Sequence, residues 1–284
     1  MSTLTAHVPS GPARIAVQVQ PQHTDYASIR RICATLEELG VDMLLNWDHF
    51  FPLSGDPDGL HYECWTMLAA WAEATEHVEI GALVSCNSYR NPQLLADMAR
   101  TVDHISARGG EGRLVLGIGS GWAERDYDEY GYPFGTAGSR LDDLARDLPL
   151  IRERWSKLNP APTRDIPILI GGGGEKKTLR IVAEHASIWH TFGEAETITR
   201  KGAVLDEWCA TVGRDPSQIV RSAGVAPTPG RMPEQVDSYP TNAQSLYDVG
   251  VRLFTTGISG EAFGDASALS AVREMVAWRD DVNA

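Results

Sequence analysis

The stretch Leu114-Val115-Leu116-Gly117-Ile118-Gly119-Ser120-Gly121-Trp122 passes from an apolar, strand-like segment directly into a glycine cluster. The same junction recurs where Ile166–Ile170 runs into Gly171-Gly172-Gly173-Gly174. Because glycine has no Cβ, backbone N–H groups in such a turn can close around an anion, and a following helix adds the positive end of its dipole. Two turns of this kind predict a phosphate-bearing cofactor that is held by two loops.

Strand-like and helix-like segments alternate along nearly the whole chain. Apolar runs predict eight strands, at 14–20, 41–46, 78–84, 114–118, 166–170, 186–191, 219–225 and 252–256. Each run is followed by a segment with helical spacing or by a long loop. This repetition predicts an α/β protein with the (β/α)8 (TIM) barrel fold, in a single domain over residues 1–284 because no Pro/Gly/Ser linker divides the chain. The long loops at 48–61, 119–138 and 226–240 are then expected on the catalytic face of the barrel.

The composition excludes some classes of partner. The formal net charge is −13 at pH 7, so neither nucleic acid nor an anionic membrane surface is expected as a partner. No apolar stretch reaches the length of a bilayer span, and we expect no signal peptide. The four cysteines contain no CxxC pair, which suits a reducing cytosol, and a cytoplasmic location is therefore expected.

The end of the second predicted strand carries the side chains best suited to proton transfer. Asp48 and His49 lie there, and an aspartate beside a histidine can set its tautomer and its pKa. The alternative interpretation is a packed, hydrogen-bonded histidine without a catalytic role. No HxH or HExxH spacing accompanies the pair, so no metal site is predicted.

Two further segments border the expected barrel mouth. The third predicted strand is followed by Ser85, Cys86 and Asn87, small and polar side chains that could line a flat ring. Lys176 opens the helix after the second glycine cluster and is a candidate contact for a phosphate. The alternatives are an ordinary loop, with Arg90 on the surface, and a solvated helix start.

Six motifs occur in an order that matches a known superfamily. They are Gly40-Val41-Asp42, Trp47-Asp48-His49-Phe50, Arg90-Asn91-Pro92, Asp103-His104-Ile105-Ser106, Gly117-Ile118-Gly119-Ser120-Gly121-Trp122 and Pro167-Ile168-Leu169-Ile170-Gly171-Gly172. So arranged, they resemble the bacterial luciferase-like flavin and deazaflavin oxidoreductases, and most closely the F420-dependent oxidoreductases of actinobacteria. The resemblance covers roughly residues 14–225.

The resemblance implies where a cofactor would bind. Members of the superfamily hold a tricyclic ring in the mouth of the barrel, with its phosphate on the loops after strands 4 and 5. By position in the motifs, Asp48 would contact the ring and His49 would face the reacting carbon. Many relatives have a cis peptide behind the ring, which maps to Leu83–Val84. With Lys176 added, the expected cofactor contacts are Asp48, Leu83, Val84, Cys86, Gly119, Ser120, Gly121, Trp122, Gly171, Gly172, Gly173 and Lys176.

Departures from relatives bear on the substrate. The sugar-phosphate dehydrogenases of the group have a tryptophan four residues after the histidine and a glutamate after the Gly-x-Gly, where this chain has Leu53 and Trp122. Glucose 6-phosphate is therefore not expected as the substrate. The segment before the second glycine cluster, at 157–162, is short, and because this segment often helps to cover the site we expect a more open pocket.

The resemblance leads to one functional expectation and two alternatives. We expect a coenzyme F420-dependent oxidoreductase that transfers a hydride between the deazaflavin and a small organic substrate, with His49 and Asp48 as its catalytic pair. The alternatives are an FMN-dependent luciferase-like monooxygenase, which needs a reductase partner, and a non-catalytic flavin- or deazaflavin-binding protein. Arg90, Arg125 and Lys176 are candidates to hold the glutamate tail of F420.

The substrate pocket is expected to suit a flat, partly apolar molecule. Its expected lining residues are Gln18, Gln20, Trp47, Phe50, Phe51 and Trp189.

Self-association as a homodimer is also expected. The superfamily usually dimerises through helices on one side of the barrel, and the helix after the second strand is rich in apolar side chains. They are Trp65, Met67, Leu68 and Trp71, for which packing inside the core is the alternative explanation.

Overall fold

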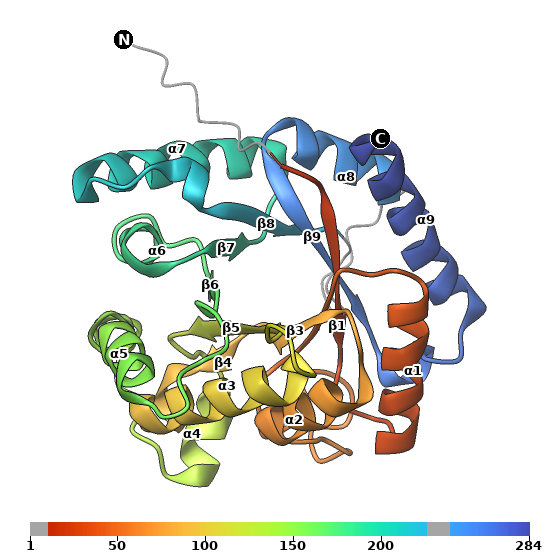
Figure 1. Cartoon of the computed structure of the whole chain (residues 1–284), viewed down its shortest axis with the longest axis horizontal. Coiled ribbons are helices and arrows are strands. Elements are labelled where there is room, and N and C mark those ends of the chain that lie inside the picture. Colours follow the sequence, from red (N-terminus) through yellow and green to blue (C-terminus); the bar gives the residue numbers. More distant parts are fainter. Residues whose placement is uncertain (1–10, 226–238) are drawn as a thin grey trace.

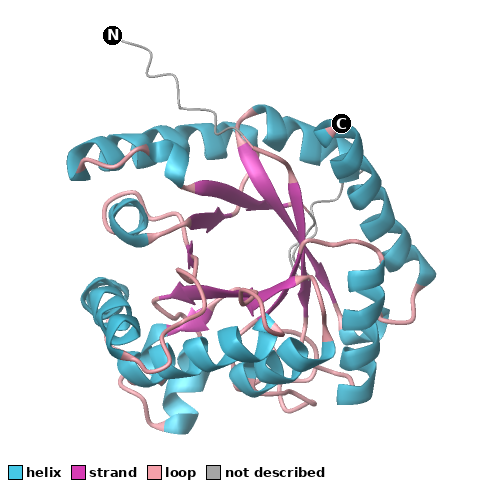
Figure 2. Ribbon diagram, in the orientation of Figure 1, coloured by secondary structure: helices cyan, strands magenta, loops and turns pink. Residues whose placement is uncertain are grey.

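Eight parallel strand positions close into a barrel that the helices surround (Figures 1 and 2). The computed structural model describes residues 11–225 and 239–284. The strands are β1 (Arg14–Val19), β2 (Met43–Asn46), β3 (Glu79–Ala82), β4 (Ser85–Cys86), β5 (Leu114–Gly119), β6 (Ile168–Gly171), β7 (Ile188–Thr191), β8 (Val220–Gly224) and β9 (Val251–Ile258). Their order is β3-β2-β1-β9-β8-β7-β6-β5-β4, and pairing of β3 with β5 closes the ring. The expected (β/α)8 barrel is confirmed.

The helices form the outer layer of the barrel (Figure 2). They are α1 (Tyr26–Glu38), α2 (Cys64–Ala74), α3 (Pro92–Ala107), α4 (Glu124–Tyr130), α5 (Ala137–Lys157), α6 (Thr178–His185), α7 (Ala195–Val212), α8 (Tyr239–Asp248) and α9 (Ala266–Asn283). The short helix α4 lies inside segment 119–138, for which the sequence pattern predicts only a loop. Two acidic residues in its first turn interact favourably with the positive end of the helix dipole. The helix ends at Gly131, whose φ of 69° is left-handed.

The third predicted strand, 78–84, is interrupted. β3 pairs with β5 through Ile80 opposite Leu114, and β4 pairs with the same strand through Ser85 opposite Ile118. Between them, the Leu83–Val84 peptide bond is cis. The cis bond that the resemblance implies is confirmed, and β3 and β4 share one strand position of the barrel.

Side chains that alternate along each strand form two separate cores. On β1, Ile15 and Val17 face outward and join the large core between the barrel and the helices. Ala16 faces the barrel axis, where it packs with Met43, Leu45, Val115, Leu169, Ile188 and Leu253. These inward-facing side chains fill the N-terminal half of the barrel interior. At the C-terminal ends of β5 and β6, Gly119 and Gly171 stand instead, and they add no side chain to the mouth.

Helix α2 does not present the apolar face that was expected to form a dimer. Trp65, Met67, Leu68 and Trp71 are each at most 3% exposed and pack in the core between the barrel and the helices. Nε1 of Trp65 also donates to Ser85 Oγ at 3.1 Å. Core packing therefore explains this apolar run, and the argument for self-association from this helix was wrong.

The short segment before β6 lies at the end of the barrel opposite the mouth. The N–H and the hydroxyl of Thr163 donate to Asp103 Oδ2 at 2.8 and 2.7 Å, and Gly112 N–H donates to Thr163 Oγ1 at 2.7 Å. Because Gly112 precedes β5, these contacts place the segment at the N-terminal ends of the strands. In this chain the segment therefore does not cover the mouth, and the expected openness of the pocket stays a prediction.

Two further expectations concern the loop after β8 and a membrane span. Most of the loop expected at 226–240 falls on residues 226–238, which lie outside the described residues. None of the described helices combines the length and the apolar character needed to cross a membrane.

Candidate active site

His49 lies just beyond the C-terminal end of β2, but its carboxylate partner is not the neighbouring Asp48. Its Nδ1 lies 2.6 Å from Oδ2 of Asp126, which belongs to α4. The side chain of His49 is 10% exposed and that of Asp126 is 3% exposed. The expectation that the adjacent aspartate orients the histidine was therefore wrong, because the loop after β5 brings a different carboxylate to the ring.

Asp126 is held by three hydrogen bonds, although it is buried. Besides His49, Oδ2 accepts from the Tyr89 hydroxyl at 2.9 Å, and Oδ1 accepts from Phe50 N–H at 3.1 Å. Burial opposes ionisation of the carboxyl, but these hydrogen bonds and the charge of His49 outweigh it and lower the pKa of Asp126. Asp126 is therefore a carboxylate at neutral pH, and Tyr89, whose pKa is raised by burial, is a neutral phenol.

Asp48 forms a buried ion pair. Arg90 donates to both of its carboxylate oxygens, at 2.5 and 2.9 Å, and Cys86 N–H donates to Oδ2 at 3.0 Å. The side chains of Arg90 and Asp48 are 11% and 1% exposed. A further bond joins Arg90 to Glu63 Oε1 at 3.0 Å. Arg90 is thus not on the surface, and its charge is already matched by carboxylates of this chain.

The Leu83–Val84 bulge enters the mouth and rests on the two glycine strands. A Cβ added at Gly119 would lie 2.8 Å from Val84 Cγ2, and one added at Gly171 would lie 3.1 Å from Val84 Cγ1. Gln18 Nε2 donates to Leu83 O at 2.8 Å. The glycines of the two clusters therefore have a structural reason, since larger residues at either position would collide with the bulge.

The second glycine cluster forms an open turn beside a lysine that the sequence reasoning missed. A Cβ added at Gly173 would lie 2.3 Å from Lys201 Nζ and 2.8 Å from Thr191 Oγ1, so an amino group and a hydroxyl converge on this glycine. Within the described part of the chain, Lys201 Nζ has no hydrogen-bond or ionic partner. Lys176 is exposed and shows no polar contact there either. The periodicity of α7 gives no signal for Lys201, because a lysine on a helix usually faces water.

A buried histidine faces the barrel interior next to this turn. Nδ1 of His190 lies 2.9 Å from Ser222 Oγ, and Nε2 has no partner among the described residues. Burial lowers the pKa of His190 to about 4, so the ring is neutral at pH 7. The neighbouring Trp189 points the other way, into the core beneath the helices, and its Nε1 donates to Gly172 O at 2.8 Å. The expectation that Trp189 lines the pocket was therefore wrong, because the next residue on β7, His190, is the one that faces the barrel interior.

Aromatic rings surround the histidine at the mouth. The indole of Trp122 is 66% exposed and stands edge-on to His49, with 5.5 Å between the ring centroids. The ring centroid of Trp47 lies 6.4 Å from that of His49, and Trp47 Nε1 donates to His61 Nε2 at 3.1 Å. Behind them Phe50 stacks on Tyr130 at 4.0 Å. Ser120 and Gly121 turn their carbonyl groups to Tyr127 and Arg140, which fixes the loop that carries Trp122.

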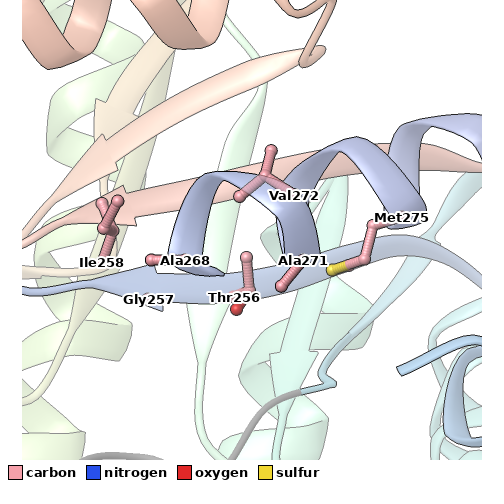
Figure 3. A pocket seen from close by; sticks show the side chains of 7 residues that line it. All are labelled: Thr256, Gly257, Ile258, Ala268, Ala271, Val272 and Met275. Atoms are coloured by element: carbon pink, nitrogen blue, oxygen red, sulfur yellow. The ribbon is translucent and has the colours of Figure 1, made fainter. Parts of the chain in front are cut away.

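A separate small cavity lies outside the barrel, between β9 and α9 (Figure 3). Its volume is about 50 Å³, and its lining is Thr256, Gly257, Ile258, Ala268, Ala271, Val272 and Met275. Figure 3 shows that α9 covers it with small and apolar side chains. It is too small for a cofactor and holds no charged group, so the candidate site is the barrel mouth. Among the described residues, no group of three or more His, Cys, Asp or Glu side chains is arranged to hold a metal ion.

The fold and these mouth residues place the chain among the (β/α)8-barrel proteins that carry their site at the C-terminal ends of the strands. It belongs to the luciferase-like monooxygenase family, which matches residues 10–247. An uncharacterised protein of Mycobacterium tuberculosis is 26% identical over 204 residues, covering 64% of this chain and 70% of that one. An F420-dependent glucose-6-phosphate dehydrogenase of Amycolatopsis mediterranei is 30% identical over 169 residues, covering 53% of this chain and 47% of that enzyme.

Solved structures share the fold at low sequence identity. An F420-dependent secondary alcohol dehydrogenase in complex with an F420-acetone adduct superposes with a TM-score of 0.79 at 16% identity, over 95% of this chain and 99% of that one. The oxygenating constituent of a 3,6-diketocamphane monooxygenase from Pseudomonas putida, in complex with FMN, gives a TM-score of 0.69 at 12% identity, over 93% and 96% of the two chains. Enzymes of both cofactor types thus share this barrel.

Proposed function

We propose that this protein is a coenzyme F420-dependent oxidoreductase that transfers a hydride between the deazaflavin and a small, neutral organic substrate. The observation that carries the proposal is the placement of His49, with Nε2 unpartnered in the described structure, at the same end of the barrel as the Leu83–Val84 bulge and the Gly173–Lys201 turn. The relatives named as F420-dependent enzymes support it.

The residues at the mouth fit a flat ring joined to a phosphate. The glycines at 119 and 171 add no side chain beside the bulge of Val84. The turn at Gly173 offers a backbone N–H without an acceptor among the described residues, together with the free amino group of Lys201. The unpartnered Nε2 of His190 is a buried polar atom that a ligand in the barrel would satisfy.

In this proposal the bound deazaflavin supplies the hydride chemistry, and the chain supplies position, exclusion of water and a proton. His49 gives or takes the proton at Nε2, and the rings of Trp122 and Trp47 lie edge-on to its imidazole. Lys201 and the Gly171–Gly173 turn bind the phosphate. Asp48, held by its ion pair with Arg90, accepts from the backbone N–H of Cys86 and so would fix this part of the mouth around a bound ring.

A neutral substrate follows from the charges near His49. Arg90 is paired with Asp48 and Glu63, and Arg125 is paired with Asp58 at 2.5 Å while it covers the ring of Phe51. The guanidinium of Arg90 is therefore not free to bind a substrate phosphate or the glutamate tail of F420, whereas that of Arg125 is 38% exposed and its pair with Asp58 lies in solvent. Trp122 offers an apolar ring in their place, which suits an unsaturated or carbonyl compound.

A titration of the apo-protein with F420 and with FMN, followed by tryptophan fluorescence, tests the choice of cofactor. Because Trp47 and Trp122 lie beside His49, a ring in the mouth should quench their emission. We expect a micromolar or tighter Kd for F420 and weaker binding of FMN. Preference for FMN would favour the monooxygenase alternative, and tight F420 binding without turnover on any acceptor would favour a non-catalytic binding protein. Binding of neither would overturn the site.

Replacing Lys201 with methionine is expected to weaken F420 binding by about 10- to 100-fold, because a charge-assisted hydrogen bond to phosphate contributes about 1.5–3 kcal/mol. The matched control is Lys176→Met, which removes an exposed lysine with no polar contact in the described structure, and we expect a change of less than about threefold. Equilibrium titration of both variants with F420 makes the comparison. A larger loss for Lys176→Met would move the phosphate contact to the helix start.

A further inference from the structure

We infer that Asp126 is the positioning residue for His49, holding the proton of the imidazole on Nδ1 so that Nε2 is the atom that exchanges a proton with the substrate. This inference rests on the proposed function for its catalytic meaning, but the pairing itself rests only on the geometry. Asp126 lies 77 positions along the chain from His49 and is brought to it by α4.

The protonation states around the pair fix the direction of the hydrogen bond. Asp126 is ionised, since its pKa is lowered by the hydrogen bonds that offset its burial, and a carboxylate can only accept. Nδ1 of His49 must therefore donate across the 2.6 Å contact. In the neutral ring this leaves the lone pair on Nε2, and in the charged ring it leaves the exchangeable proton there.

Neighbouring groups keep their charge while His49 changes its own. Tyr89 is a phenol that donates to the same oxygen of Asp126, and His61 is neutral at pH 7 because burial and the nearby His49 lower its pKa to about 4. Asp48 is turned away and bound to Arg90. Asp126 is thus the one carboxylate among the described residues that forms a hydrogen bond with His49.

This arrangement lets the proton step occur without rotation of the ring. If a bound deazaflavin supplied a hydride to a carbonyl carbon, the carbonyl oxygen would take its proton from Nε2 of the charged His49. The ring that remains is the neutral Nδ1–H form, which is the tautomer that Asp126 favours. In the reverse direction Nε2 would accept the hydroxyl proton of an alcohol, and the bound deazaflavin would be the hydride acceptor. The oxygen gains or loses one proton and the carbon one hydride, so the step is balanced.

Tyr89 has a supporting part in the same network. Its hydroxyl donates to Asp126 Oδ2. Its ring packs against those of Phe50 and Tyr132, with 4.6 and 5.5 Å between the ring centroids. The second oxygen of Asp126 accepts from Phe50 N–H, on the residue that follows His49. Both carboxylate oxygens are therefore fixed, and the carboxylate can rotate little relative to the imidazole.

The test measures the tautomer of His49 and the kinetics of the same variants. Nitrogen-15 NMR of the imidazoles, with His49 assigned by comparison with His49→Ala, shows which ring nitrogen carries the proton in the neutral form. We expect Nδ1–H in the wild type. In Asp126→Asn the amide can donate to Nδ1, so we expect a shift toward Nε2–H, a fall in kcat of at least about tenfold, and a Kd for F420 within about threefold of wild type.

The matched control is Asp128→Asn, an exposed carboxylate on the same helix, for which neither the tautomer nor kcat should change. Tyr89→Phe keeps the stacked ring, and we expect a smaller fall in kcat with the Nδ1–H form retained. Nε2–H in the wild type would overturn the inference even if Asp126→Asn fails to fold. An unchanged kcat alongside a changed tautomer would also overturn it. Absence of F420 binding in the wild type would instead refute the proposed function, while the NMR result still decides the pairing.

Discussion

The variant His49→Ala is expected to lower kcat by about 10²- to 10⁴-fold, the range that a positioned general acid or base contributes. The structure gives the reason, since His49 lies at the mouth with Nδ1 against the carboxylate of Asp126 and with no partner for Nε2 within residues 11–225 and 239–284. Cofactor binding should change little, because the proposed phosphate contacts lie on the turn after β6 and on α7, away from β2. Steady-state kinetics with reduced F420 and a panel of unsaturated acceptors, together with F420 titration, measures the two effects separately.

The matched control for this variant is His77→Ala, whose imidazole is 87% exposed. We expect it to behave like the wild type in kcat and in Kd. If His49→Ala lost cofactor affinity in proportion to its loss of turnover, His49 would be a binding residue instead of a proton donor. Turnover equal to the wild type would remove it from the mechanism.

The variant Arg90→Met is expected to lower the free energy of unfolding by about 3–5 kcal/mol, the cost of leaving one member of a buried ion pair without its partner. Asp48 is 1% exposed on its side chain, and without Arg90 its one remaining hydrogen bond among the described residues comes from the N–H of Cys86 at 3.0 Å. Urea unfolding followed by circular dichroism measures the loss, provided that the transition stays two-state.

Two further variants make the measurement specific. Arg180→Met removes an exposed arginine that pairs with Glu184, and it should cost less than about 1 kcal/mol. The double variant Asp48→Asn/Arg90→Met should recover part of the stability, because a neutral amide needs no counter-ion. Equal, small losses in Arg90→Met and Arg180→Met would show that Asp48 is solvated and that the pair is not buried in solution.

The sequence predicts the barrel well because strand and helix patterns report local properties. Alternating residues such as Ile15 and Ala16 distinguish the outward from the inward face of a strand by their spacing alone. The glycines at 119 and 171 are visible as local motifs, whereas the cis peptide at Leu83–Val84 was implied only by the resemblance to a known superfamily.

The partners of the site residues are less predictable, because they come from different loops. Asp48 is next to His49 in the chain, yet the backbone directs their side chains to Arg90 and to Asp126. Acidic residues in a first turn and a glycine at 131 are typical of a short helix, which is α4. They do not indicate beside which strand this helix packs. The apolar side chains of α2 are a similar case. Their pattern fits both a buried core and a dimer interface, and only the structure shows that they pack in the core.

The sequence by itself therefore determined the fold class, the end of the barrel at which the candidate site lies, and the position of His49 at that end. These depend on residue periodicity and on the rule that parallel strands end at one face. Only the tertiary structure decided that Asp126 holds His49, that Arg90 neutralises Asp48, and that Lys201 reaches the turn at Gly173. Each of these contacts joins residues that are distant in the chain, and such contacts depend on the conformation of loops and on helix packing, which local patterns do not encode.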